Sequence, residues 1–242
     1  MPELKLDADA VAETIDRLCR RVEERFPDSG LSRVGRELDR IARQTRERAA
    51  AIARPILTVR MAVVALIALV AIVLAGTLAS LRKPREPVEA FQFIQVLEAG
   101  INDVVLVGAG IFFLVTLETR IKRRRALAAL RELRAVAHII DMHQLTKDPE
   151  WVMGRATRSA IVPPREMTRF ELSRYLDYCS EMLSITGKIA ALYIQTFDDD
   201  VALAAVNEVE SLTNGLSRKI WQKLMIIYAM EQETPEGLEG EA

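Results

Sequence analysis

Hydrophobic and polar positions divide the chain into two long apolar segments and several stretches in which both kinds of residue recur at helical spacing. The first apolar segment, residues 56–81, has no charged side chain after Arg60. About 20 such residues, rising about 1.5 Å each, cross the hydrocarbon core of a bilayer. The segment therefore predicts a transmembrane helix, since the alternative, a buried core helix, seldom stays uncharged for so long.

The second apolar segment, residues 104–117, is shorter than the roughly 17 to 25 residues that a span needs. It becomes long enough when Ile101, Asn102 and Asp103 lie at the interface, with some local thinning of the bilayer. We therefore predict a two-transmembrane-helix hairpin over residues 55–119.

The predicted connection between the two spans is a short external loop, residues 82–100. Within it, Phe91, Ile94 and Leu97 recur at helical spacing. This stretch either lies along the outer membrane surface as an amphipathic helix or begins a longer second membrane helix.

Arginine and lysine cluster on the outer flanks of the two spans and are sparse between them. Before the first span lie Arg40, Arg43, Arg46, Arg48, Arg54 and Arg60, and after the second lie Arg120, Lys122, Arg123, Arg124 and Arg125. The connection holds Arg82, Lys83 and Arg85, which Glu86, Glu89 and Glu98 offset. Because cytoplasmic flanks carry the excess positive charge, both termini are predicted to be cytoplasmic, in a multi-pass protein of a bacterial plasma membrane.

The remainder of the chain predicts a cytoplasmic helical bundle, so the fold class is an all-α membrane protein. Residues 1–54 read as two N-terminal amphipathic helices, with a turn at "PDSG". Residues 120–147 continue the second membrane helix, and residues 148–166, which contain Gly154 and Pro163-Pro164, form a linker. The acidic tail, residues 232–242, is predicted to be disordered.

Residues 167–231 predict a long antiparallel helical hairpin. Thr168 and Glu171 have capping-box spacing. Apolar residues then recur at steps of 3 and 4, as in a coiled coil, at Leu172, Leu176, Cys179, Leu183, Thr186, Ala190, Tyr193 and Phe197, and again at Val206, Val209, Thr213, Leu216, Ile220, Leu224 and Ile227. The short "FDDD" between them forces the two helices to pack antiparallel.

Composition narrows the classes of function. A formal net charge of -1 argues against nucleic acid as the main partner, because phosphate binding requires a basic excess. The two cysteines, Cys19 and Cys179, lie far apart and predict neither a disulfide framework nor a thiolate metal site.

The histidines offer one candidate metal site, His138, Asp141 and His143. His138 and Asp141 are three residues apart and therefore lie on one helix face. His143 is five residues from His138, which places it about 140° around the helix from His138. Two zinc-binding histidines on one helix need a spacing of four. The favoured interpretation is therefore a structural helix end with no metal, no cofactor and no enzymatic activity.

Two further sets of residues have membrane roles as candidates. The basic run Arg120, Lys122, Arg123, Arg124 and Arg125 can contact anionic lipid headgroups, and it is also an ordinary flank of a membrane helix. Asn102 and Asp103 would form a polar ring at the outer end of a pore if several copies assembled around an axis. Otherwise they are an interfacial helix start.

The arrangement of two spans with helical cytoplasmic parts is similar in architecture to the two-transmembrane effectors associated with nucleotide-signalling antiphage systems, and no residue is carried over from them. We expect an integral membrane protein whose cytoplasmic helices bind a further copy or another protein, as a scaffold or regulator. The alternative is an oligomeric ion channel or membrane-perturbing effector gated by the bundle. A metal-dependent enzyme is a weaker alternative.

Overall fold

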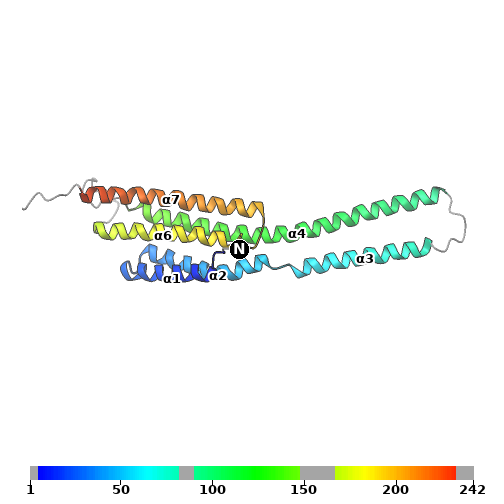
Figure 1. The fold of residues 1–242 in the computed structure, drawn as a ribbon, viewed down its shortest axis with the longest axis horizontal. Helices are drawn as coiled ribbons and strands as arrows, with labels where there is room; N and C mark the ends of the chain where they lie inside the picture. Colours follow the sequence, from blue (N-terminus) through cyan, green and yellow to red (C-terminus); the bar gives the residue numbers. More distant parts are fainter. Residues whose placement is uncertain (1–4, 82–89, 148–166, 233–242) are drawn as a thin grey trace, which may run out of the picture. The chain divides into compact units, whose positions relative to one another are not determined.

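The computed structural model describes residues 5–81, 90–147 and 167–232. Within these ranges the chain forms helices and no strand, which confirms the all-α prediction. The helices, drawn in Figure 1, are α1 (Ala8–Arg25), α2 (Gly30–Ala53), α3 (Leu57–Leu81), α4 (Ala90–Leu145), α6 (Arg169–Leu192) and α7 (Asp200–Gln232).

The chain divides into two compact units. Residues 1–52 and 126–242 form the first, which we call the bundle unit. Residues 53–125 form the second, which we call the apolar unit. The helix α4 contributes its first part to the apolar unit and its last part to the bundle unit.

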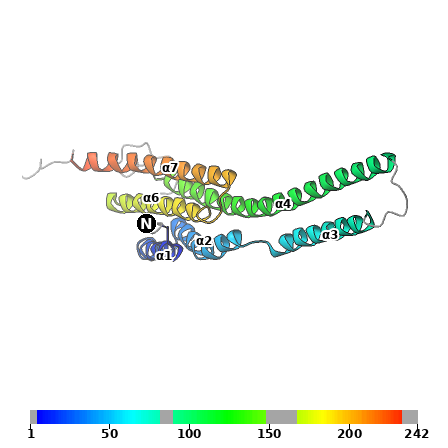
Figure 2. The same cartoon turned by 45° about the vertical axis from the view of Figure 1, so that its right-hand side comes forward.

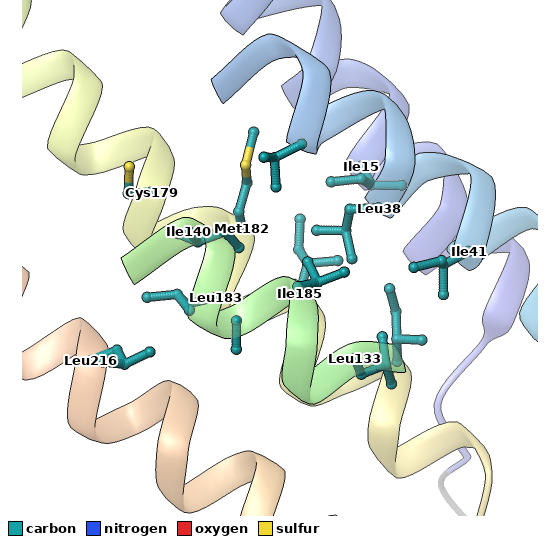
Figure 3. Close-up of a cluster of buried hydrophobic side chains, with 14 of the residues drawn as sticks. Ile15, Leu38, Ile41, Leu133, Ile140, Cys179, Met182, Leu183, Ile185 and Leu216 are labelled. Atoms are coloured by element: carbon teal, nitrogen blue, oxygen red, sulfur yellow. The ribbon is translucent and has the colours of Figure 1, made fainter. Parts of the chain in front are cut away.

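A continuous hydrophobic core fills the bundle unit. Side chains from α1, α2, α4, α6 and α7 meet in it, as Ile15, Leu38, Leu133, Met182 and Leu216 illustrate in Figure 3. In the N-terminal arm, predicted as two amphipathic helices, the residues that recur at helical spacing are buried, at Val11, Ile15, Leu18, Val22, Phe26, Leu31, Val34, Leu38, Ile41, Thr45 and Ile52. Helical periodicity therefore identified the packed faces of α1 and α2.

The helices α6 and α7 run antiparallel, side by side (Figure 2). The Ser173 hydroxyl, near the start of α6, lies 3.4 Å from the Tyr228 hydroxyl near the end of α7. A Cβ added to Gly187, late in α6, would lie 3.3 Å from Thr213 Oγ1 in the middle of α7. All predicted seam positions of the two helices are buried except Phe197, which is partly buried against the core.

Local signals set the start of each of these two helices. The Thr168 side chain accepts a hydrogen bond from the Glu171 amide while the Glu171 carboxylate accepts one from the Thr168 amide, the reciprocal capping box. At the start of α7 the Ala202 amide donates to Asp199 Oδ1 at 2.9 Å. Asp199 thus satisfies an amide that the helix itself leaves unpaired.

The hairpin packs on the N-terminal arm of its own chain. The helices α1 and α6 are in direct contact. Phe26, just after α1, meets Tyr175 of α6 edge to face with ring centroids 5.3 Å apart.

In the apolar unit two helices are long and apolar enough to cross a membrane. Of the most apolar 18-residue window in each, 6% is buried by the protein in the segment that contains α3, and none is buried in α4. A core helix of a water-soluble protein would be mostly covered. The apolar surfaces of these two helices are therefore not covered by the described part of the chain, and large exposed apolar surfaces of this kind are typical of contacts with a membrane or another protein.

Of the two alternatives left open within residues 82–100, the start of a longer second helix is the one that α4 fits. Because α4 starts at Ala90, residues 90–100 are helical rather than loop. The physical reason is that no proline follows Pro87 in this stretch and that its apolar residues already have helical spacing. At its other end α4 reaches Leu145, close to the predicted residue 147. The predicted linker, residues 148–166, and nearly all of the predicted tail lie outside the described residues.

Candidate functional site

A groove follows one face of α4 in the apolar unit. Its lining residues recur at steps of 3 and 4, so they share a helix face, and the open hollow along them has a volume of about 360 Å3. At one end lie Ala109, Phe112 and Phe113, and at the other Arg120 and Arg124. The groove therefore joins an apolar, aromatic stretch to a pair of guanidinium groups.

The basic run at this end of the apolar unit does not act as one uniform patch. Lys122 Nζ lies 2.9 Å from Glu118 Oε1, and the two side chains are only 13% and 16% exposed. Glu118 also accepts a hydrogen bond from the Ile56 amide at 3.3 Å and lies 3.7 Å from Arg60 Nε. Glu118 thus neutralises Lys122 and ties the start of α3 to α4.

The other members of the run differ from Lys122. Arg120, Arg124 and Arg125 are exposed, and they form no ion pair or hydrogen bond with the residues that the structure describes. Arg123 is half-buried and has a partner. Sequence reasoning treated all five as equivalent headgroup contacts, because a charge count cannot show which cation an acidic neighbour one turn earlier neutralises.

His138, Asp141 and His143 do not converge on a common point. His138 is exposed, while Asp141 Oδ1 accepts a hydrogen bond from Gln144 Nε2 at 2.5 Å. The ring of His143 lies against the start of α2, where a Cβ added to Gly30 would be 2.1 Å from His143 Cε1. Burial, Arg33 and Lys147 lower the pKa of His143 below its ordinary value. In the described ranges no group of three or more His, Cys, Asp or Glu residues is arranged to hold a metal ion.

The end of α4 is held by α7 instead. Lys223 Nζ donates hydrogen bonds to the backbone carbonyls of Gln144, at 2.7 Å, and Lys147, at 3.1 Å. These carbonyls are at the negative end of the helix dipole, where a cation is favourable. Lys223 was not singled out from the sequence, because capping between helices distant in the chain leaves no local signal.

A second charged network lies in the bundle unit around Glu132 of α4. Its carboxylate pairs with Arg48 and, at 2.9 Å, with Arg40, both from α2. The hydrogen bonds that Arg40 donates to the carboxylates of Glu37 and Glu132 raise the pKa of Arg40 above its usual value. This network joins α2 to α4. It was not predicted from the sequence, because the pattern of charged residues indicates only a solvent-exposed helix face and not which charges pair between helices.

Asn102 and Asp103 are both exposed on α4. Neither side chain forms a hydrogen bond to the residues described, so no described protein group covers them in a single copy of the chain. They stay available to solvent, to lipid headgroups or to a neighbouring copy.

One exposed face of α7, beside its seam with α6, carries apolar side chains near the end of the helix. Trp221, Met225 and Tyr228 follow one another at steps of 4 and 3, so they form a stripe on one face, and Trp221 is 59% exposed. We call this the α7 stripe. It was missed from the sequence because the buried seam of the same helix has the same periodicity and dominated the pattern.

Comparison with protein-family models, with curated proteins and with solved structures found no match. The residues and their geometry therefore carry the functional argument.

Proposed function

We propose that the protein is an integral membrane protein in which α3 and the first part of α4 span the bilayer and the bundle unit acts as an interaction domain, as a scaffold or regulator. One observation carries the proposal. The bundle unit buries its own apolar seams, whereas the apolar windows of α3 and α4 are left uncovered. Exposing an apolar window of 18 residues in each helix to water is strongly unfavourable, and a bilayer removes that cost.

The placement in a bacterial plasma membrane, with both termini cytoplasmic, rests on the charged flanks. Arg54 and Arg60 precede the apolar part of α3, and Arg120, Arg124 and Arg125 follow that of α4. Positive flanks are retained on the cytoplasmic side. The bundle unit is then cytoplasmic as well.

We propose a second copy of the chain as the first partner of the α7 stripe. Copies in one membrane share one orientation and are concentrated in two dimensions, so a weak apolar contact between them is favoured over the same contact in free solution. A twofold arrangement would bring the stripe of one copy onto that of the other, because such an interface uses the same residues on both sides. Aromatic residues and methionine are also enriched in protein interfaces.

The first experiment measures membrane insertion and then mass. The full chain, expressed in bacteria, is extracted with alkaline carbonate, and insertion predicts that it stays with the membrane pellet. Its mass in detergent is then measured by light scattering with the detergent contribution subtracted. A dimer that the double variant Trp221→Ala, Met225→Ala reduces to monomer supports the interaction. Leu203→Ala is the control, because Leu203 is exposed on the same face of α7 but lies about five turns before Trp221. A monomeric wild-type chain would overturn self-association.

The channel alternative is kept because Asn102 and Asp103 are exposed and free to face an axis in a larger assembly. It requires a defined oligomer, since the two membrane helices of a single copy cannot enclose a pore. It also requires ion flux in liposomes that Asp103→Ala changes. A defined assembly without flux would leave the scaffold role and remove the channel.

The metal-enzyme alternative has the weakest support. Its three candidate residues point to different surroundings: His138 to solvent, Asp141 to Gln144, and His143 to the start of α2. Metal analysis of the purified chain tests it directly.

A further inference from the structure

We infer that the groove on α4 binds one anionic phospholipid from the cytoplasmic leaflet, with the phosphate at Arg120 and Arg124 and an acyl chain along Phe112 and Phe113. The inference rests on the proposed membrane function. Beyond that function, each chain is inferred to hold one anionic phospholipid, which the groove residues distinguish from the lipids of the surrounding bilayer.

The phosphate end of the site follows from charge. Arg120 and Arg124 are one helical turn apart, about 6 Å along the axis, and line the same end of the groove. Neither is neutralised by an acidic residue in the described ranges. Guanidinium groups bind phosphate oxygens in pairs of parallel hydrogen bonds, so two adjacent arginines can hold one phosphate.

The apolar end follows from position along the helix. Phe113 precedes Arg120 by seven residues, which is about 10 Å along the axis. A phosphate held at the arginines therefore places the first part of an acyl chain beside the two phenylalanines. Both rings are exposed within the chain, so an acyl chain can cover them without displacing protein side chains.

The neighbouring cations differ from the two groove arginines, so the site differs from a general basic surface. Lys122 lies between the two arginines in the sequence, but its charge is already paired with Glu118. Arg54 and Arg125 are exposed, belong to the same apolar unit and are absent from the groove lining. They provide a control that removes the same charge from the same unit.

The test is native mass spectrometry of the full-length chain in detergent, titrated with phosphatidylglycerol or with phosphatidylcholine of the same acyl chains. The wild type should retain one phosphatidylglycerol per chain. The double variant Arg120→Gln, Arg124→Gln should lose affinity for it by roughly 25-fold, about five-fold for each charge. The double variant Arg54→Gln, Arg125→Gln should stay close to wild type, and glycerol phosphate, which has no acyl chain, should not compete.

Several outcomes would overturn the site. Equal loss in both double variants would mean diffuse attraction to the basic surface. Equal retention of both lipids by the wild type would mean no preference for an anionic headgroup, since both lipids carry a phosphate and only phosphatidylcholine has a compensating positive charge. Competition by glycerol phosphate would mean a free phosphate site. The proposed membrane function is tested separately, because a chain that inserts into neutral phosphatidylcholine vesicles but shows no preference refutes only this inference. A chain that fails to insert into any vesicle refutes the membrane function itself.

Discussion

At the scale of single residues, ion pairs in the bundle unit differ in how much solvent surrounds them. Glu132 is 31% exposed and pairs with two arginines of α2. Glu181 of α6 is 42% exposed and, among the residues that the structure describes, pairs with Arg21 alone. Solvent screens the second pair more strongly, and it involves a single contact. The two glutamates therefore form a matched comparison.

We predict that Glu132→Gln lowers the stability of the bundle unit by about 1–2 kcal/mol, since it removes two charge-assisted contacts, while Glu181→Gln costs about 0.5 kcal/mol or less. Thermal unfolding of the full chain in detergent should show a drop in Tm of about 2–6 °C for the first variant. Equal shifts for the two variants would contradict the distinction.

The cysteines are expected to be chemically quiet. Burial raises the pKa of the Cys179 thiol to about 12. Burial, followed by the carboxylates of Asp39 and Asp16, raises the pKa of Cys19 to about 12. An ordinary thiol is roughly one-tenth thiolate at pH 7.5, and the thiolate is the reactive form.

We therefore predict that N-ethylmaleimide at pH 7.5 modifies neither cysteine of the folded chain in the time that modifies a free peptide thiol. Both should react after unfolding in denaturant. Mass spectrometry of the wild type and Cys19→Ser assigns each event to its residue. Rapid labelling of Cys179 in the folded chain would show that the α6 seam opens.

His143 gives the bundle unit a dependence on pH. Its pKa is lowered by burial first and then by Arg33 of α2 and by Lys147, so the folded chain favours the neutral ring. In the unfolded chain the ring titrates near pH 6.5. The unfolded state therefore takes up the proton first, and stability that is present above pH 6.5 is lost as the pH falls towards the lowered value.

We predict that Tm falls between pH 7.5 and 5.5 and that His143→Gln makes this fall smaller. His138→Gln is the matched control, because His138 is exposed on the same helix. The quantity compared is the slope of Tm against pH in each variant and in the wild type. Taking the difference between the slopes cancels the contribution of the carboxylates, which all the proteins share. An unchanged slope in His143→Gln would show that the ring is not held neutral.

At the scale of elements, two helical glycines separate packing from helix propensity. Gly35 of α2 is buried, and a Cβ there would lie 3.0 Å from Met182 Cε and 3.2 Å from Cys19 Sγ. A Cβ added to Gly215 of α7 would have no atom within 4 Å apart from its own helix backbone and chain neighbours. Alanine favours a helix interior at both sites, but only at Gly35 does it meet the core.

We predict that Gly215→Ala stabilises the protein by about 0.5–1 kcal/mol, whereas Gly35→Ala destabilises it by about 1–2 kcal/mol because overpacking outweighs propensity. Thermal unfolding of the full chain should therefore show Tm shifts of opposite sign. A rise in both variants would mean that Met182 moves aside at little cost.

Predictability from sequence also differs between elements. The buried faces of α6 and α7 could be predicted because one apolar seam and a capping box set their register and start. The start of α4 was left open, since apolar residues beside a predicted membrane segment fit a loop, a surface helix or the same helix equally well. Contacts such as Glu118 with Ile56 and Lys223 with the α4 carbonyls join residues far apart in the chain, so no local pattern indicates them. The candidate groove was anticipated only as a run of cations.

At the scale of the whole molecule, the proposed topology depends on an even number of spans and on charged flanks of one sign. With α3 and α4 both crossing the bilayer, the two termini must lie on the same side, and the arginine-rich flanks place that side in the cytoplasm. We predict that a fluorescent protein fused to either terminus fluoresces and that alkaline phosphatase fused to either terminus is inactive. Phosphatase inserted at residues 82–89 should be active.

The two reporters control each other, because fluorescence and phosphatase activity require opposite sides of the membrane. Opposite locations for the two termini would mean that only one apolar helix crosses. The shorter apolar segment of α4 would then be the one to lie outside the bilayer core, since its uninterrupted run, residues 104–117, is below the usual length of a span. In that case Arg120 and Arg124 would no longer lie at a fixed membrane depth, and the phospholipid preference of the α4 groove should disappear together with the predicted topology.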